Sequence, residues 1–515
     1  MDSIIKRDAI YLVLACAISV LFMLVFSYNT SPLTSEYGFD QAFFQLVGAG
    51  MHDGMVPYRD FHDMKGPYLF FMEWFGQLLC RGRFGCFLLQ VICSTATFFL
   101  IFKLMDRARS LTDDGLVKRI IIGLAACVPC LLVLAVSLEG GNLPEELSLP
   151  FLMASTYCNV NFFIELDKNG KPLYKRSWAI VNGICVCIVA LMRITNAAFM
   201  LTTLLCVAIA ILRRGKTKHF LVSLGWFVLG VVVAAIPAVV YCLANGVLGE
   251  MVYLVFLFGF SYSGGTGFTG RMEEFNEKSG GILPTLMWWA LSPVVATLLV
   301  QTKRAWAWGV SALGAVATYV GIFVGHGYVH YAGTRVPLVA FAAFLLAYRV
   351  PGRDGAKYAQ LVIGVVAMLV IAHMQMPFVD ASTTKSEDSI RYHQNVSSEN
   401  SDYPVVMDVA NRIPLDERDS VFCFGDTYWS RWYCMSGIYP EFRYCDYQGD
   451  HFAYDRRLEV ELERDMEERP PQWLVTKGDV SELSPLMGRV ISDKYELSYE
   501  NEKYALYHLI SPSGA

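Results

Sequence analysis

Most of the side chains that can do chemistry lie in one stretch after the first apolar segment. Asp40 is the first of them, after Tyr37-Gly38-Phe39. A second cluster follows and reads Gly54-Met55-Val56-Pro57-Tyr58-Arg59-Asp60-Phe61-His62-Asp63-Met64-Lys65-Gly66-Pro67. A carboxylate can take the proton of an acceptor hydroxyl, and a cation can stabilise the charge that builds on a departing phosphate. Carboxylates and cations this close together therefore suit general acid–base chemistry in which a developing negative charge is stabilised.

Structural readings compete with the chemical ones. Four candidates fall within six positions and cannot all face one way: Asp60, His62, Asp63 and Lys65. A turn held by Asp side chains before Gly66 is one alternative, and an Asp63–Lys65 ion pair with no further role is another. Asp40 has the alternative of capping a helix over 41–50, because Asp is a favoured N-cap.

These motifs resemble a known family. An acid soon after the first span, then Gly-x-x-Pro-Tyr-x-Asp, then Asp-x-Lys-Gly-Pro before an apolar helix is similar to the C superfamily of polyprenyl-phosphate-sugar-dependent glycosyltransferases. Within it, the group related to bacterial protein mannosyltransferases and the lipid A aminoarabinose transferase is most similar. The matches concentrate in 37–67, and the topology extends over about 1–350. The resemblance implies that Asp40 is the catalytic base and that Lys65 contacts the donor phosphate.

The resemblance is incomplete at one point. Metal-dependent oligosaccharyltransferase relatives carry an Asp-x-Asp dyad in this loop, whereas Asp60-Phe61-His62-Asp63 has a different spacing. We therefore predict no metal site and no cofactor, with a divalent metal requirement left open.

Weaker matches add further candidates for substrate binding. Glu145 and Glu146 lie in Asn142-Leu143-Pro144-Glu145-Glu146, where they either position the acceptor or start a helix. Arg193 lies between two apolar runs, where it either binds a lipid phosphate or snorkels to headgroups.

A later connection holds the last three candidates, His326, His330 and Tyr331. Hydrogen bonds to a sugar or phosphate are favoured over a metal pair, since the connection lacks a third ligand. Anchoring of the tyrosine at the membrane interface is the alternative.

The elements that position these residues are predicted to be membrane helices. Of 515 residues 54% are hydrophobic and only 17% charged, and the mean hydropathy is +0.39. The net charge of -5 without a basic stripe argues against nucleic acid as a partner. Eleven apolar stretches are long enough to span: 9–27, 84–104, 119–137, 148–165, 177–192, 196–212, 219–243, 283–300, 305–324, 333–349 and 360–375. The predicted fold class is a polytopic α-helical membrane protein.

Charge distribution predicts the orientation. The connections assigned to the inside hold twenty Lys and Arg, against eight in the outside connections before residue 376. The N-terminus is then cytoplasmic, and the loop 28–83 and the tail are extracytoplasmic. The apolar segment 67–80 is too short to cross and is predicted to lie in the interface.

Composition separates two domains, a transmembrane glycosyltransferase-like domain over 1–375 and a soluble extracytoplasmic domain over 376–515. The tail has fourteen Lys and Arg against twenty-six Asp and Glu. Alternating runs at 420–424, 472–476 and 504–510, with a charged helix over 456–468, predict a small α/β domain after a linker over 382–402. Cys423, Cys434 and Cys445 allow one disulfide and a free thiol.

The predicted activity is an inverting hexosyl- or pentosyltransferase of the cytoplasmic membrane. Its partners are a polyprenyl-phosphate-linked sugar, membrane lipids and a glycan, lipid or protein acceptor of the cell envelope. The loop over 258–281 is a candidate lid over the substrate. A flippase or transporter of lipid-linked sugars, a glycan polymerase or ligase using a lipid diphosphate, and a scaffold displaying the tail are the alternatives.

Overall fold

The computed structural model describes residues 2–34, 37–109, 115–259, 268–278, 283–324, 328–348, 402–426, 428–446, 448–478 and 484–510. Contacts divide the chain into two compact units. The helical unit comprises Met1–Thr34, Phe87–Tyr241 and Thr266–Ile390. The loop–tail unit comprises Ser35–Cys86, Cys242–Gly265 and Arg391–Ala515.

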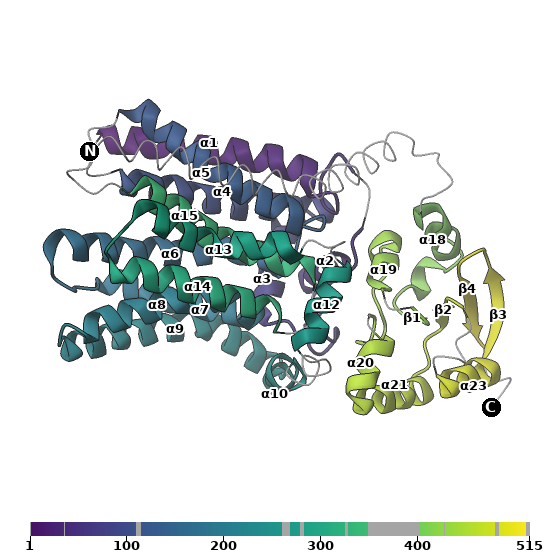
Figure 1. The fold of residues 1–515 in the computed structure, drawn as a ribbon. Helices are drawn as coiled ribbons and strands as arrows, with labels where there is room; N and C mark the ends of the chain where they lie inside the picture. Colours follow the sequence, from purple (N-terminus) through teal and green to yellow (C-terminus); the bar gives the residue numbers. More distant parts are fainter. Residues whose placement is uncertain are drawn as a thin grey trace. The chain divides into compact units, whose positions relative to one another are not determined.

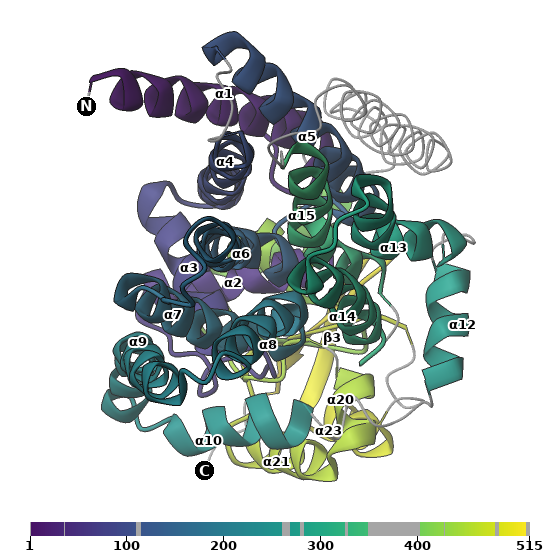
Figure 2. The same ribbon diagram turned by 60° about the vertical axis from the view of Figure 1, so that its left-hand side comes forward.

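Long helices running side by side build the helical unit (Figures 1 and 2). Those lying wholly or mainly in it are α1 (Asp2–Phe26), α4 (Arg83–Ala108), α5 (Leu116–Ser137), α6 (Pro144–Asn169), α7 (Arg176–Arg193), α8 (Ala198–Leu212), α9 (Thr217–Ala244), α12 (Phe268–Lys278), α13 (Leu283–Val300), α14 (Ala305–Ile322) and α15 (Val336–Ala347). The short helices η1 (Ile194–Ala197) and η3 (Val329–Arg335) precede α8 and α15.

The unit is that of a multi-pass membrane protein. Eight stretches of the described chain are long and apolar enough to cross a bilayer, the longest being Arg176–Leu212. On α9, large apolar side chains such as Leu221, Val232 and Val240 are exposed, as expected of a surface that faces lipid. Ten of the eleven predicted spans coincide with helices, and the eleventh, 360–375, lies outside the described residues.

Helix α6 extends beyond its predicted span, whereas the break between α7 and α8 agrees with the prediction. α6 continues to Asn169 because nothing interrupts it until Gly170, whose left-handed φ of 66° ends the helix. The stretch Arg176–Leu212 is broken at Arg193, whose backbone is extended at φ -158° and ψ 112°. The chain therefore forms the two helices that the sequence predicted, α7 and α8.

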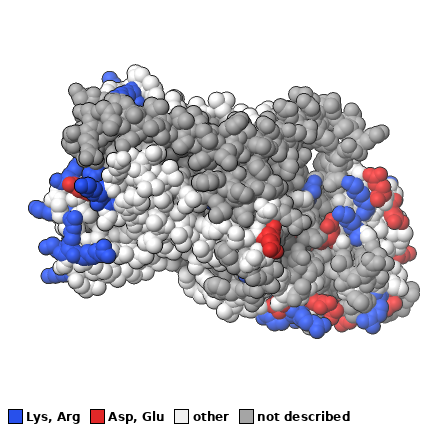
Figure 3. Space-filling model, in the orientation of Figure 1, with Lys and Arg blue, Asp and Glu red and all other residues white. Residues whose placement is uncertain are grey.

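Basic residues gather at one end of the helical unit, beside a broad uncharged surface (Figure 3). Exposed Lys and Arg follow α6 and α8 there: Lys168, Lys171, Lys175, Arg176, Arg213, Arg214, Lys216 and Lys218. The positive-inside bias predicts that this end is cytoplasmic.

Buried polar side chains tie α6 to its neighbours. Ser155 donates to Asn182 on α7 over 2.5 Å, and Asn159 donates to Thr203 on α8 over 2.8 Å. The Tyr174 hydroxyl joins the same network through a 2.6 Å bond to Asn159. Such bonds hold membrane helices together, so they fix α6, which begins with Pro144-Glu145-Glu146.

The loop–tail unit combines segments from three parts of the chain. From the first loop come α2 (Asp40–His52) and α3 (Pro67–Leu79), and from the middle come α10 (Leu248–Val252) and the π-helix η2 (Tyr253–Phe258). The tail supplies α18 (Asp402–Ala410), η4 (Leu415–Glu417), α19 (Ser430–Ser436), α20 (Gln448–Tyr454), α21 (Arg456–Glu468) and α23 (Pro485–Lys494).

A four-stranded sheet organises the tail (Figure 1). Its strands are β1 (Val421–Phe424), β2 (Trp473–Thr476), β3 (Tyr495–Glu500) and β4 (Ala505–Leu509), in the order β1-β2-β4-β3. β1 pairs parallel with β2, and the other pairs are antiparallel. The small α/β domain is confirmed, with helix α21 at the predicted bounds. The edge strand β3 was missed, because it follows α23 directly and most of its side chains are exposed.

α3 presents an apolar face outward. It buries Glu73 and Gln77 but exposes Trp74, Phe75 and Leu78. Exposed aromatic and aliphatic side chains beside buried polar ones suit a helix that meets lipid, so the interfacial position stays our prediction.

The contacts group the first loop with the tail. The predicted boundary at 375/376 and most of the predicted linker lie outside the described residues. Cys423, Cys434 and Cys445 are free thiols, two of them buried.

Candidate active site

Asp40 is the first residue of α2 in the loop–tail unit. The N-cap position belongs to Phe39, so Asp40 does not cap the helix in the way the alternative reading requires. The carboxyl is half-buried. Packing of α2 on α3 holds its position, because a Cβ on Gly48 would stand only 2.7 Å from the Cβ of Glu73.

The second cluster folds into a tight loop rather than an open one. Tyr58 adopts a left-handed φ of 71°, and its buried hydroxyl donates to the Lys65 carbonyl over 2.8 Å. The Asp60 carboxylate accepts from the Val56 amide over 2.6 Å and pairs with Arg59. Asp60 therefore stabilises the loop. The left-handed backbone of Tyr58 is strained for a residue with a side chain, and such strained residues cluster at functional sites.

Asp63 and Lys65 lie together. One Asp63 oxygen accepts from the Lys65 amide over 3.0 Å and stands 3.8 Å from its ammonium. The Lys65 nitrogen also lies 5.7 Å from the ring centre of Phe44. The turn and the ion pair that were expected as alternatives are both present. Together they hold the Lys65 ammonium at the end of the loop.

Residues of the tail complete the cluster. The His62 amide donates to the Arg443 carbonyl over 2.9 Å, and the Arg443 guanidinium binds the Tyr58 carbonyl over 3.2 Å and Glu250 over 2.8 Å. The His62 ring is buried 5.2 Å from that of His451. Neither nitrogen of His62 has a hydrogen-bond partner among the described residues.

Burial sets the protonation of this cluster. It lowers the pKa of His451 to about 3 and that of His62 well below its ordinary value, so both rings are neutral. Burial raises the pKa of Asp63, and the negative charge of Asp40 raises it further, while the Lys65 ammonium lowers it in part. Burial also raises the pKa of Asp446, and Asp40 again contributes. Asp40 thus lies within electrostatic reach of two buried carboxyls whose pKa values it raises further.

In the helical unit a second cluster joins three of the sequence candidates. Glu145, in the first turn of α6, pairs with Arg193 at the end of α7. The Arg193 guanidinium lies 3.4 Å from the ring centre of Tyr331. Both charged side chains are largely buried. Arg193 is therefore neutralised inside the protein, which differs from either reading of the sequence.

Glu146 has other partners, although it is adjacent to Glu145. Its carboxylate accepts two bonds from Gln90, at 2.9 and 3.1 Å, and one from the Asn142 amide at 3.0 Å. Glu146 thus anchors the start of α6 to α4, while Glu145 faces Arg193. The sequence did not distinguish the two.

His330 pairs with Glu139, with 2.5 Å between the Nδ1 and a carboxylate oxygen. Its ring is perpendicular to that of Tyr331, 4.7 Å away. His326 lies outside the described residues, as does much of the predicted lid, of which 268–278 form α12.

Arg335 is a residue that the sequence reasoning missed. It ends η3, is 0% exposed, and none of its three guanidinium nitrogens has a hydrogen-bond partner among the described residues. A buried cation without a partner is costly. In the sequence Arg335 is a lone Arg before an apolar run, one of the eight Lys and Arg counted in the outside connections. Asp446, His451 and Arg443 gave no signal, because they lie far along the chain from the loop.

A solved structure matches the fold over nearly the whole chain. The crystal structure of ArnT from Cupriavidus metallidurans bound to undecaprenyl phosphate matches 97% of this chain and 98% of its own, with a TM-score of 0.57 and 10% sequence identity. The chain has the ArnT fold. The resemblance to the C-superfamily group that includes the aminoarabinose transferase is thereby confirmed at the level of fold. No family model and no curated protein sequence matches the chain.

Proposed function

We propose that this protein is a membrane glycosyltransferase that moves a sugar from a polyprenyl-phosphate donor to a cell-envelope acceptor, with inversion. The ArnT-like fold over nearly the whole chain supports the class. The observation that carries the proposal is the loop–tail cluster, where Asp40 and the Asp63–Lys65 pair belong to one compact unit.

The proposed step needs a base and a stabilised leaving group. Asp40 takes the proton of the acceptor hydroxyl as its oxygen bonds to the anomeric carbon of the sugar. The bond from that carbon to the phosphate oxygen breaks, and the phosphate leaves with the electron pair. Lys65 stabilises the charge on the phosphate.

The helical unit offers a further candidate for the donor. Arg335 is a buried guanidinium without a described partner, which suits an anionic ligand, while Arg193 is already neutralised by Glu145. We propose that Arg335 is an anion-binding residue of the helical unit, and that Glu145, Arg193, His330 and Tyr331 contribute to substrate binding in that unit.

Sugar transfer by the purified protein in lipid tests the proposal. The donors are a panel of polyprenyl-phosphate sugars, and the acceptors are cell-envelope fractions. We expect Asp40→Asn to lose at least about a hundredfold in rate, the usual range for a general base. Asp53→Asn, at the other end of α2, is the matched control and keeps its rate, since Asp53 pairs with Arg81 and Tyr439 at an exposed site.

Two results would contradict the proposal. A well-folded Asp40→Asn with an unchanged rate would remove Asp40 as the base but leave the class. No binding of undecaprenyl phosphate and no transfer by the wild type would remove the class itself.

A further inference from the structure

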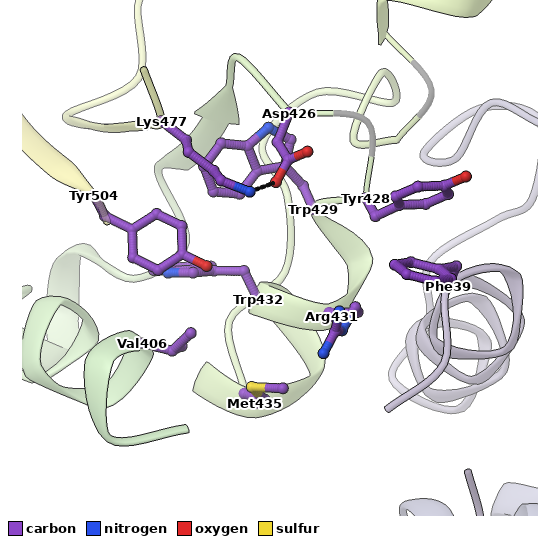
Figure 4. Close-up of a pocket in the computed structure, with 10 residues that line it drawn as sticks. All are labelled: Phe39, Val406, Asp426, Tyr428, Trp429, Arg431, Trp432, Met435, Lys477 and Tyr504. Carbon is purple, nitrogen blue, oxygen red and sulfur yellow. Dashed lines mark hydrogen bonds and ion pairs between the residues drawn. The ribbon is translucent and has the colours of Figure 1, made fainter. Parts of the chain in front are cut away.

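A small pocket in the loop–tail unit lies at the residue before the proposed base (Figure 4). Its volume is about 120 Å³. Phe39 lines it from the first loop, and Tyr428, Trp432 and Tyr504 line it from the tail. Drug-sized ligand pockets measure about 300–1,000 Å³, so this one suits a single ring.

Aromatic rings supply much of the lining. Phe39 and Tyr428 form a tilted pair with centroids 4.4 Å apart, and Phe39 is 50% exposed. Tyr504 and Trp429 form another tilted pair, 5.7 Å apart. Aromatic faces offer apolar contact to the C–H groups of a flat ligand while their polar tips remain available for hydrogen bonds.

Polar groups are placed around these rings. Lys477 and Asp426 form an ion pair of 2.6 Å on the pocket wall, and both are partly exposed, so each retains hydrogen-bonding capacity. The Arg431 guanidinium lies 5.4 Å from the Phe39 ring centre. The charged lining residues carry a net charge of +1, which disfavours a purely apolar occupant.

Two buried indoles add an independent observation. Trp429 and Trp432 line the pocket and are 1% and 2% exposed, yet neither indole N–H has an acceptor among the described residues. Because both indole nitrogens are shielded from solvent, a ligand in the pocket would meet the indole rings and not their N–H groups.

We propose that this pocket binds one sugar ring of the acceptor glycan. A pyranose has C–H groups for contact with the aromatic rings and hydroxyls for hydrogen bonds to the Asp426–Lys477 ion pair. Phe39 directly precedes Asp40, the first residue of α2. A sugar ring held in this pocket therefore lies near the start of α2, which carries the proposed base. This inference rests on the proposed function and narrows its acceptor to a glycan.

Saturation-transfer NMR on the full-length protein in nanodiscs tests the site without relying on activity. The probes are the methyl glycosides of glucose, N-acetylglucosamine and glucuronic acid. We expect at least one to bind. Tyr428→Ala removes an aromatic contact and Lys477→Met removes a hydrogen-bond donor, and each should weaken binding about two- to tenfold. Tyr454→Ala is the matched control, since Tyr454 is a 37% exposed tyrosine of the same unit that does not line the pocket.

A transfer assay gives the second readout. Tyr428→Ala should raise the acceptor KM by the same factor, with kcat and binding of undecaprenyl phosphate unchanged. Failure of all three glycosides to bind the wild type, or binding unaffected by both pocket variants, overturns the inference. Binding that depends on the pocket, combined with no transfer from any polyprenyl-phosphate sugar, supports the sugar site and counts against the proposed function alone.

Discussion

Replacing Arg335 by methionine should have opposite effects on stability and on donor binding. The guanidinium is fully buried, and its three nitrogens lack hydrogen-bond partners among the described residues. Each unsatisfied buried donor costs about 1–3 kcal/mol. Methionine fills similar space without those donors, so we expect the free energy of unfolding of the ligand-free protein to rise by about 3 kcal/mol or more.

Thermal unfolding in detergent, with and without undecaprenyl phosphate, measures both effects. A ligand at one hundred times its Kd stabilises a protein by about 2.7 kcal/mol. We expect the wild type to show a rise of this order. Arg335→Met should unfold at a higher temperature without ligand and show little further rise with it.

Arg193→Met is the matched control, because its guanidinium has a partner. Removing it leaves Glu145 buried and unpaired, so we expect a loss of about 3–5 kcal/mol. A lower unfolding temperature for Arg335→Met without ligand, or an undiminished response to undecaprenyl phosphate, would refute the reasoning about this cation.

Two further predictions concern the loop–tail unit. Gly48→Ala should lower the free energy of unfolding by about 1–3 kcal/mol and slow transfer, because the new Cβ would lie 2.7 Å from the Cβ of Glu73. Calorimetry measures the loss, and Gly225→Ala is the control, since nothing lies within 4 Å of a Cβ at that position. Lowering the pH should destabilise the unit, because the buried neutral rings of His62 and His451 resist protonation while the unfolded histidines bind a proton below about pH 6.5. Between pH 7 and pH 5 the contribution of His451, whose folded pKa is about 3, to the free energy of unfolding should fall by about 2 kcal/mol. Urea titrations at both pH values measure this: the wild type should lose about 2 kcal/mol more between them than His451→Phe does, and an equal loss in the two proteins would contradict the assignment.

Much of the helical unit could be predicted from the sequence. A bilayer demands about twenty apolar residues per crossing, so hydropathy alone locates α1, α5 and α9. The break between α7 and α8 also follows, because 37 residues exceed one span. Strand β3 could not be found in this way, since an edge strand with exposed side chains carries little periodic signal.

The candidate site was predictable only where its residues are local. The motif around Asp63 and Lys65 fixed both the turn and the ion pair. The choice between Glu145 and Glu146 depends on which neighbour faces which helix, and neighbours on a helix point about 100° apart. His451 reaches His62 through tertiary folding across hundreds of residues, which no local pattern encodes.

The three-part origin of the loop–tail unit constrains how the chain threads the membrane. Segments that fold into one compact body must emerge on the same face of the bilayer, so each pair must be separated by an even number of crossings. Six long helices, α4 to α9, separate the first segment from the second, which satisfies this parity. If the basic connections are cytoplasmic, the same count of crossings predicts that the segment carrying Asp40 leaves the membrane on the extracytoplasmic face, which nucleotide-activated sugars of the cytoplasm do not reach. An enzyme so placed depends on a sugar that has already been carried through the membrane, and a lipid carrier meets that need.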